Sequence, residues 1–495
     1  MISEHLPILA VILPLVGALT VLLAGWAERR YCYPVAVAVL TIQFGLSLAI
    51  LREVLRGGTI HYYLGDWAPP WGIELVVDHL SAYVLVILVF LSLLSCIYAK
   101  RSIGGEIDPQ KTVAFYVMFL LLVVGVCGIT VTGDIFNLYV FLEISSIAAY
   151  TLVASGREKK GLLAGFNYLI MGTISACFIL IGIGHLYVVT GTLNMADLAR
   201  LLPPLYDSTI IHVAFIFFIV GLSIKTALFP LHTWLPDAYS HAPSAISVLI
   251  STVISKMGIY ATIRILFSVF TVGFIVDHLP ILEFFAWVAA IAVIAGSVIA
   301  IAQTDLKRML AYSSVSQMGY IMLGIGIANS VAMTGGVLHI LNHALIKGCL
   351  FMVAGAIIYR VGLRKIDDFK GLAGRMPYTC AAFFIAAISM IGLPPTVGFM
   401  SKWYLTLGAI EAGEWFFVVV ILASTLLNAI YFWRVLEYAY FRHADAETPE
   451  LESRVPVSML LPMLVLAAGC VVFFFAVSIP LGIIDAAVAD LLGGA

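Results

Sequence analysis

Charged side chains are scarce in this chain. Only 11% of its 495 residues are charged, 62% are hydrophobic, and the mean hydropathy is +1.08. A composition this apolar excludes a soluble globular protein and indicates a polytopic membrane protein. The formal net charge is only −2, and the few charges concentrate in short connections. The sequence therefore has no basic arm or acidic tail that would indicate nucleic-acid binding.

Cysteine motifs are also missing. The seven cysteines stand singly, mostly within apolar runs, at Cys32, Cys96, Cys127, Cys177, Cys349, Cys380 and Cys470. Without C-x-x-C or C-x-x-C-H, the sequence argues against a disulfide framework, an iron–sulfur cluster and a c-type haem. We therefore expect no cofactor. The opening MISEHLPILA has no basic n-region and no small-residue cleavage site follows it, so we expect a retained first helix rather than a signal peptide.

Long apolar runs dominate what is present. Runs of roughly 18 to 25 apolar residues can span a bilayer as helices. About fourteen occur, near 6–25, 32–51, 79–98, 112–132, 135–155, 162–189, 210–229, 243–268, 281–303, 309–328, 331–359, 379–409, 415–440 and 457–483. The predicted fold class is an all-α polytopic membrane protein of about 14 transmembrane helices.

Lysine and arginine mark every second connection between these spans. They gather at 29–30, 100–111, 157–160, 307–308, 360–375 and 442–454. By the positive-inside rule these connections are cytoplasmic, which places both termini on the outer side. The connection after the seventh span contains neither lysine nor arginine. We therefore expect 231–243 to be a loop held within the protein.

Two spans are interrupted by proline. The stretch from Val220 to Ile259 carries Lys225 and is broken by Pro230 and Pro236. The stretch IGLPPTVGFMSKW, at 391–403, repeats this arrangement with Lys402 near its break. Paired broken helices in corresponding positions indicate inverted repeats and a site near the midplane. The two halves would centre on spans seven and twelve.

Ionisable residues inside the predicted spans are few. Glu143 is the clearest acidic one, and the lysines are Lys225, Lys256, Lys347 and Lys402. An unpaired charge at the bilayer centre costs from about 2.5 to more than 10 kcal/mol, so these groups must be paired, hydrated or neutral. They indicate an ion pathway.

Glu143 and Lys225 are a candidate switch, provided that the fold brings them together. A lysine that alternates between a carboxylate partner and isolation changes its proton affinity by several units. The alternative is an ion pair that only joins two helices. For Lys256 the alternative is a side chain that snorkels to the interface. The apolar run that continues from Met257 to Phe270 favours a pathway role.

The segment HILNHALIKGCLFM places His339, His343 and Lys347 at successive spacings of four. On a helix they share one face, close enough to pass a proton through intervening water. Two other interpretations remain, namely histidines satisfied in the bundle core and a pair of metal or haem ligands. A third ligand of the H-E-x-x-H kind is not nearby, so we expect no metal.

Four further residues are candidates near the breaks and turns. Lys402 follows the second break, where unwound carbonyls and a helix end could hold water or a cation; the alternative is a lysine that reaches the interface. His232 and Asp237 would shape the first broken helix and support transfer. Asp134 could line an access route from outside, although helix capping is the simpler role.

Four segments carry a resemblance to a known family. They read KTALFPLHTWLPDAYSHAPSAISVLIS, TDLKRMLAYSSVSQMGY, HILNHALIKGCLFM and LPPTVGFMSKW. They resemble, in order, signature segments of the antiporter-like subunits of respiratory complex I and of Mrp-type cation/proton antiporters. The resemblance runs from about the fourth to the thirteenth span. It implies fourteen helices with two inverted five-helix repeats, each containing a discontinuous helix.

The resemblance also implies domains and site residues. The domains would be 1–111 (helices 1–3), 112–270 (first repeat), 271–441 (second repeat) and 442–495 (helix 14). The family's ion-transfer residues fall on Glu143, Lys225, Lys256, His343, Lys347 and Lys402. TGDIFNLYVFLEISSIAAYTLVA is most similar to the D subunit of Mrp antiporters. Closely similar subunits occur in energy-converting membrane-bound hydrogenases.

The resemblance implies an ion-translocating subunit in a prokaryotic plasma membrane that is not itself an enzyme. It would move protons along the buried axis, coupled to export of Na⁺ in a complex with other membrane subunits. The first alternative is the same module driven by a redox complex. Two others are a membrane redox subunit that binds haem or quinone and an assembly scaffold with inert charges.

Overall fold

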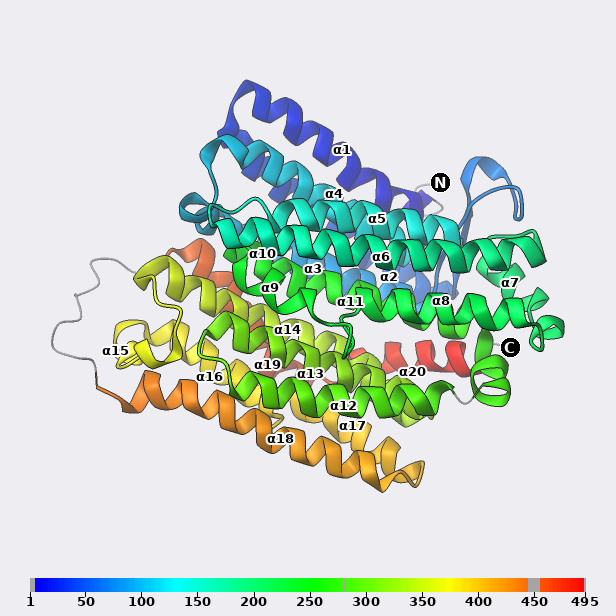
Figure 1. The fold of residues 1–495 in the computed structure, drawn as a ribbon. Helices are drawn as coiled ribbons and strands as arrows, with labels where there is room; N and C mark the ends of the chain where they lie inside the picture. Colours follow the sequence, from blue (N-terminus) through cyan, green and yellow to red (C-terminus); the bar gives the residue numbers. More distant parts are fainter. Residues whose placement is uncertain (1–4, 280, 444–454, 494–495) are drawn as a thin grey trace.

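A computed structural model describes residues 5–279, 281–443 and 455–493. Long helices run side by side in one bundle, and α1 begins and α20 ends toward the same end of it (Figure 1). The helices are α1 (Leu6–Ala27), α2 (Cys32–Gly57), α3 (His79–Glu106), α4 (Thr112–Val131), α5 (Ile135–Val153), α6 (Lys159–Thr190), α7 (Met195–Leu201), α8 (Thr209–Lys225), α9 (Trp234–His241), α10 (Ser244–Leu249), α11 (Ser255–Ile263), α12 (Ile281–Ile301), α13 (Leu306–Ile327), α14 (Ser330–Val361), α15 (Leu372–Arg375), α16 (Pro377–Ile391), α17 (Val397–Glu411), α18 (Trp415–Leu436), α19 (Val457–Phe475) and α20 (Ser478–Gly493).

Each predicted span falls on helical structure, and the fold class is confirmed. Eleven helical stretches of the described residues have the length and hydropathy of a membrane span, and two shorter apolar helices are α8 and α16. The basic connection at 442–454 lies largely outside the described residues. The last predicted span, near 457–483, is instead two helices, because α19 ends at Phe475 and α20 continues to Gly493.

The connection between α2 and α3 contains the two described strands, which the sequence analysis did not predict. They are β1 (Ile60–Tyr63) and β2 (Glu74–Val77), paired antiparallel with Ile60 opposite Val77. The pairing satisfies backbone groups of a connection that packs against the end of the bundle. Glu74 is buried there, with its carboxylate 2.8 Å from the Asn194 amide.

Two helical stretches form the centre of the bundle. In Ser244–Val269 every residue is buried except Ser268, and α14 is buried from Ala332 to Ile357. A helix that is buried on all sides shows no single apolar face. By contrast, α1, α6 and α18 expose large apolar side chains such as Leu23, Leu162 and Leu426. Those faces suit lipid or neighbouring subunits.

The two halves are built alike. In each, the fourth of five predicted spans is broken, at α8–α9 in one half and at α16–α17 in the other. The packing pairs correspond as well, since α4 packs on α5 as α12 packs on α13, and α6 packs on both α8 and α9 as α14 packs on both α16 and α17. The fourth and ninth spans are separated by five crossings, so the halves run in opposite directions, as inverted repeats do.

The backbone at the first break differs from the prediction in the role of Pro236. α8 ends at Lys225, and the chain turns through Pro230 before α9 starts at Trp234. Pro236 breaks nothing, because it lies in the first turn of α9, where its missing N–H has no partner to lose. The stretch 231–243 is held within the protein as predicted, but it is mainly this short helix rather than a loop.

Candidate ion-translocation site

The last residue of α8 meets the middle of α5. The Lys225 amine donates to the Glu143 carboxylate at 2.9 Å, to the Ser146 hydroxyl at 2.7 Å and to the Tyr150 hydroxyl at 3.4 Å. These three partners lie on one face of α5 because they are spaced by three and four. The negative end of the α8 dipole adds to the attraction for the lysine. The fold therefore brings Glu143 and Lys225 together, which is the condition that the sequence analysis set for a switch.

The break after Lys225 is held by aromatic side chains. The Trp234 indole donates to the Ile224 carbonyl at 2.8 Å, which satisfies a carbonyl that the end of α8 leaves free. The same indole stacks on Tyr168 with ring centroids 4.1 Å apart. His232 is buried and stacks on Phe229. Among the described residues His232 has no hydrogen bond to Lys225, and its stacking contact lies within the break itself.

Lys256 lies at the centre of the bundle, beside a π-helical turn at Ile250–Ile254. Its amine donates to the Ser251 carbonyl and, at 3.3 Å, to the Ser255 hydroxyl. A π-helical turn displaces carbonyls from their ordinary partners and is frequent at functional sites. Among the described residues Lys256 has no acidic partner within ion-pair distance. It is fully buried, so the snorkelling alternative is wrong.

The two histidines of α14 differ sharply in their contacts. His339 lies between the Ser401 hydroxyl, 2.8 Å from Nδ1, and the Gln317 amide oxygen, 2.9 Å from Nε2. The imidazole of His343 is stacked parallel to it at 6.0 Å. Neither nitrogen of His343 has a hydrogen-bond partner among the described residues. Buried polar atoms of this kind are ordinarily satisfied by ordered water.

Lys347 completes this face of α14. Its amine donates to the Leu310 carbonyl at 2.7 Å and to the Ser313 hydroxyl, both on α13. Lys347 and His343 are each close enough to Lys256 for direct charge interaction. The structure thus places Lys256, in the last span of the first half, near His343 and Lys347 of the second half.

Lys402 lies at the second break and is buried, so the interface alternative is wrong. Its amine donates to the Met390 carbonyl at 3.1 Å, the Ile391 carbonyl at 2.8 Å and the Thr425 hydroxyl at 3.4 Å. It also lies 5.0 Å from the centre of the Tyr320 ring, a cation–π contact. The free carbonyls at the end of α16 therefore hold the amine of Lys402 itself.

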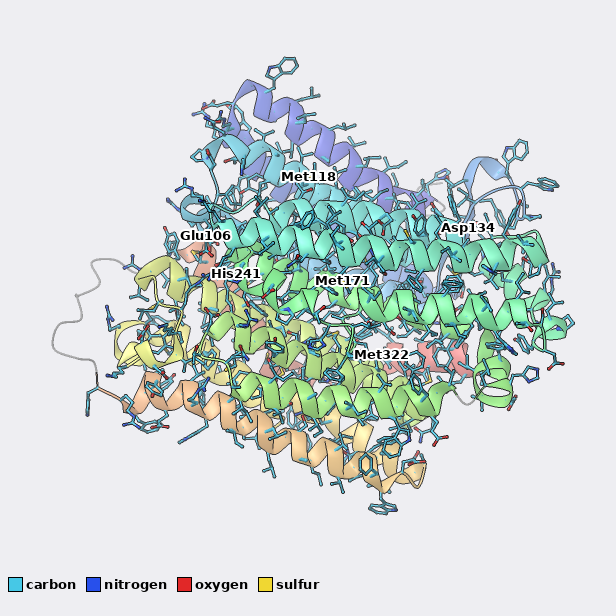
Figure 2. The ribbon with its side chains drawn as sticks, viewed as in Figure 1. Glu106, Met118, Asp134, Met171, His241 and Met322 are labelled. Carbon is cyan, nitrogen blue, oxygen red and sulfur yellow. The ribbon has the colours of Figure 1, made fainter. Side chains whose placement is uncertain are left out.

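Asp134 and Asp237 lie at opposite ends of the bundle. Asp134 caps α5, accepting from the Asn137 backbone N–H at 2.7 Å, and it lies far from Glu106 and His241 (Figure 2). Burial raises the pKa of the Asp134 carboxyl above its ordinary value. Asp237 pairs with Arg308 at 3.1 Å near the other end. Neither carboxylate is hydrogen-bonded to the buried lysines.

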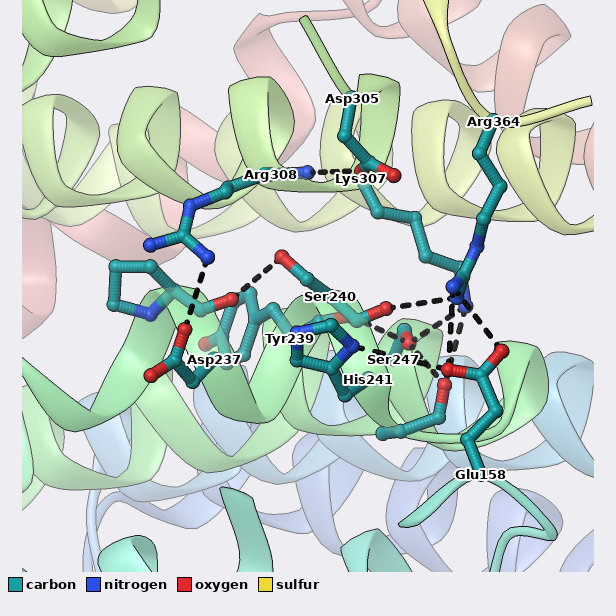
Figure 3. A network of polar contacts seen from close by, with 12 residues as sticks. Glu158, Asp237, Tyr239, Ser240, His241, Ser247, Asp305, Lys307, Arg308 and Arg364 are labelled. Carbon is teal, nitrogen blue, oxygen red and sulfur yellow. Dashed lines mark hydrogen bonds and ion pairs between the residues drawn. The ribbon is translucent and has the colours of Figure 1, made fainter. Parts of the chain in front are cut away.

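Three cations of the second half hold the first half's broken helix (Figure 3). Lys307 donates to the Ala242 carbonyl at 3.1 Å, and Arg308 pairs with Asp237. Arg364 donates to the Ser240 carbonyl at 3.2 Å and pairs with Glu158 at 3.1 Å. The end of α9 carries partial negative charge, which these cations neutralise.

Sequence reasoning missed several buried polar residues, two of which are partners of His339. It passed over Arg264, which lies inside the run from Met257 to Phe270 that was read as apolar, and over the buried Lys307. It also missed Gln317 and Ser401. The signal for Arg264 was available, since any arginine inside a span requires a partner. Among the described residues no group of three or more His, Cys, Asp or Glu side chains could hold a metal ion.

Comparison with known proteins gives the family. The family described as NADH:quinone oxidoreductase/Mrp antiporter, TM matches residues 132–428. The chain is 48% identical to NADH-quinone oxidoreductase subunit N of Desulforudis audaxviator, covering 95% of both chains. It is 32% identical to the D subunit of the Na⁺/H⁺ antiporter of Bacillus subtilis, covering 92% of this chain and 90% of that one.

A solved structure agrees with these relatives. A chain of the membrane-bound sulfane sulfur reductase, an archaeal respiratory membrane complex, superposes with a TM-score of 0.91 at 31% identity, covering 99% of this chain and 98% of that one. The family match covers more than half of the chain. The protein is thus a multi-pass membrane protein of the NADH:quinone oxidoreductase/Mrp antiporter family, an antiporter-like ion-pumping subunit.

Proposed function

We propose that this subunit moves protons along a buried polar axis that runs from Glu143 and Lys225 through Lys256 to His343, Lys347 and Lys402. The contact that carries the proposal is the 2.9 Å pair of Lys225 and Glu143 beside the first break. A buried lysine with a carboxylate partner holds its proton, and it releases the proton when the partner withdraws. His339, His232 and Asp237 support the axis, and Asp134 caps the helix that carries Glu143.

The path is divided between the two repeats. We place the first repeat at 112–270 and the second at 271–441, between helices 1–3 in 1–111 and the last helices in 442–495. Lys256 belongs to the first repeat and is close enough to interact with His343 and Lys347 of the second. Charge on one lysine therefore changes the energy of charge on the other. Protons pass from one half to the other at this point.

The subunit works with other membrane subunits in a prokaryotic plasma membrane, with both termini outside. A redox-driven respiratory complex is the first candidate, supported by the 48% identity to an N subunit of NADH-quinone oxidoreductase and by the superposition on a respiratory membrane complex. A cation/proton antiporter of the Mrp type, which exchanges Na⁺ for protons, is the second. It is supported by the 32% identity to an antiporter D subunit.

The test uses inverted vesicles from antiporter-deficient cells that express the native gene cluster. A pH gradient formed on addition of an electron donor supports the redox-driven complex, whereas collapse of a preformed gradient by Na⁺ supports the antiporter. Lys225→Ala should abolish either response at equal protein level. Lys159→Ala, at an exposed lysine that starts α6, should leave the response intact. A full response from Lys225→Ala would refute the proposed axis.

A further inference from the structure

A cavity of about 710 Å³ lies at the end of the bundle where α1 begins and α20 ends. Its walls come from β2, the turn between α4 and α5, α7, and the residues that follow α11. Glu74, Asp78, Asp197 and Asp490 line it together with Arg264. A volume of this size accommodates many water molecules beside polar walls. The proposed axis from Glu143 to Lys402 does not use this cavity.

A four-residue polar cluster, Asp78, Ser81, Tyr260 and Arg264, closes the floor of the cavity. Arg264 pairs with Asp78 and donates to the Ser81 hydroxyl at 2.8 Å and to the Tyr260 hydroxyl at 2.9 Å. The Ser81 and Tyr260 hydroxyls are 2.9 Å apart, and the Tyr260 hydroxyl donates to the Thr130 carbonyl at 3.0 Å. The Asp78 carboxylate accepts from the Ser81 backbone N–H at 2.9 Å, and Arg264 Nη2 contacts both Asp78 and the Ser81 hydroxyl. Tyr260 and Ser81 are fully buried, whereas Asp78 and Arg264 line the cavity.

The cluster stands on the same helix face as Lys256. Lys256, Tyr260 and Arg264 follow at spacings of four, so they lie one above the other. Lys256 and Arg264 are separated by about 12 Å of helix rise, and Tyr260 is halfway between them. The face thus leads from the central lysine to the floor of the cavity. The side chain of Lys256 is directed the other way, toward the Ser251 carbonyl.

We propose that this cluster is an outer proton port, through which Lys256 exchanges protons with the cavity. The proposal rests on the proposed function, since it assumes that Lys256 carries protons. When the Lys256 amine turns toward Tyr260, its ammonium gives one proton to the Tyr260 oxygen. The Tyr260 hydroxyl turns from the Thr130 carbonyl and passes its proton to the Ser81 oxygen. The Ser81 hydroxyl, which shares Arg264 Nη2 with Asp78, rotates and passes its proton to the Asp78 carboxylate. Asp78 then releases a proton to water in the cavity, and both hydroxyls are regenerated.

Each residue of the cluster has a defined part in this step. Arg264 favours the ionised form of Asp78, so the acid does not retain the proton. Tyr260 and Ser81 both donate and accept, which a relay of hydroxyls requires. Both hydroxyls belong to fully buried side chains, so the cavity meets the cluster at Asp78 and Arg264. The position of the Lys256 amine decides whether the port is connected to the axis.

The first test concerns access. Ala199 lines the cavity, and Cys177 is the exposed one among the native cysteines. In a Cys177→Ser background, Ala199→Cys is labelled in intact cells with a membrane-impermeant thiol reagent. Vesicles are then prepared and transport is compared with and without label. We expect labelling from outside, and a bulky label should slow transport at least five-fold. No labelling, or labelling with undiminished transport, would overturn the port.

The second test removes the relay hydroxyl. Tyr260→Phe keeps the ring and deletes the hydroxyl, and we expect transport to fall about 10-fold or more, since a positioned proton-transfer group contributes on the order of 10²-fold in rate. The matched control is Tyr98→Phe, which removes a buried hydroxyl that donates to the Met352 carbonyl at 2.9 Å and lies outside the cluster. Equal rates for the two variants would overturn the relay.

A structural effect of Tyr260→Phe is separated by the solvent isotope effect. If proton transfer through the port limits the rate, Tyr260→Phe should change the ratio of rates in H₂O and D₂O, whereas a packing defect lowers both rates equally. Failure of the proposed function is recognised separately, because Lys225→Ala would then transport normally in the same vesicles. Loss of transport in Lys225→Ala together with full transport in Tyr260→Phe would overturn the port alone.

Discussion

The Lys225 amine lies 2.9 Å from the Glu143 carboxylate and thereby ties the last residue of α8 to the middle of α5. The lysine side chain is 5% exposed and the glutamate side chain 22%. The pair is therefore shielded on the lysine side and more accessible on the glutamate side. This asymmetry suits a pair in which the carboxylate changes partner while the lysine remains in place.

Neutralising Glu143 tests this pair directly. Glu143→Gln keeps the size and the acceptor oxygen but removes the negative charge that pairs with the Lys225 amine. We expect transport in vesicles to fall at least 10-fold, the loss typical of a missing proton-transfer partner. Ser146→Ala, which removes another hydrogen-bond partner of the same amine, should cost much less. Comparable losses in the two variants would show that the hydrogen bonds, not the charge, matter.

Gln317 fixes His339, and replacing it should impair the second half. The Gln317 amide oxygen lies 2.9 Å from His339 Nε2, so it selects which ring nitrogen carries the proton. Gln317→Leu leaves that nitrogen without a partner, and we expect transport to fall several-fold while protein level is kept. Gln317→Glu retains an acceptor and should restore part of the rate. Assay of both variants in the same vesicles decides the matter.

The Asp237–Arg308 pair should matter little for stability. Each side chain is 39% exposed, and exposed pairs contribute about 0.2–1 kcal/mol. Asp237→Asn should therefore lower the thermal unfolding temperature of the purified complex by no more than a few degrees, and transport should fall only slightly, as expected of a residue that supports the axis without carrying protons. Loss of transport in this variant would give Asp237 a direct part in ion movement.

Gly398 should tolerate no side chain. A Cβ at this position would lie 1.8 Å from the Ser389 carbonyl oxygen, where α17 passes the end of α16. Relieving such a clash requires a backbone shift that costs about 1–3 kcal/mol or more. Gly398→Ala should reduce the amount of folded protein, measured by size-exclusion of the solubilised complex. Gly469→Ala, whose nearest neighbour would be at 3.5 Å, should behave like the wild type.

Acid should weaken the Asp78–Arg264 pair. Burial raises the pKa of the Asp78 carboxyl, but attraction to Arg264 and hydrogen bonds from Ser81 outweigh it, so the pKa lies below its ordinary value. The stability gained from the pair is complete above the ordinary pKa of about 4 and is lost as pH falls through the lower folded value. Asp78→Asn should unfold at lower temperature at pH 7 and lose less on acidification. The unfolding temperatures of the wild type and of Asp78→Asn, measured at pH 7 and at an acidic pH below about 4, check this.

The sequence by itself determined the spans, their two breaks and the set of buried charges. Apolar length, proline and the cost of burying a lysine are properties of residue types, so Lys225, Lys256 and Lys402 could be identified without coordinates. Helix capping was also predicted as the simpler role of Asp134, and Asp134 caps α5. The buried Arg264 was open to the same argument and was overlooked.

Only the tertiary structure decided how those charges are satisfied. The carbonyls that hold Lys402, the amide that orients His339 and the hydroxyl beside Lys347 come from other helices, and their positions follow from which helix faces pack together. The π-helical turn beside Lys256 and the division of the last span into α19 and α20 are likewise backbone adjustments to packing. Hydropathy measures how apolar a segment is, and it contains no information about its neighbours.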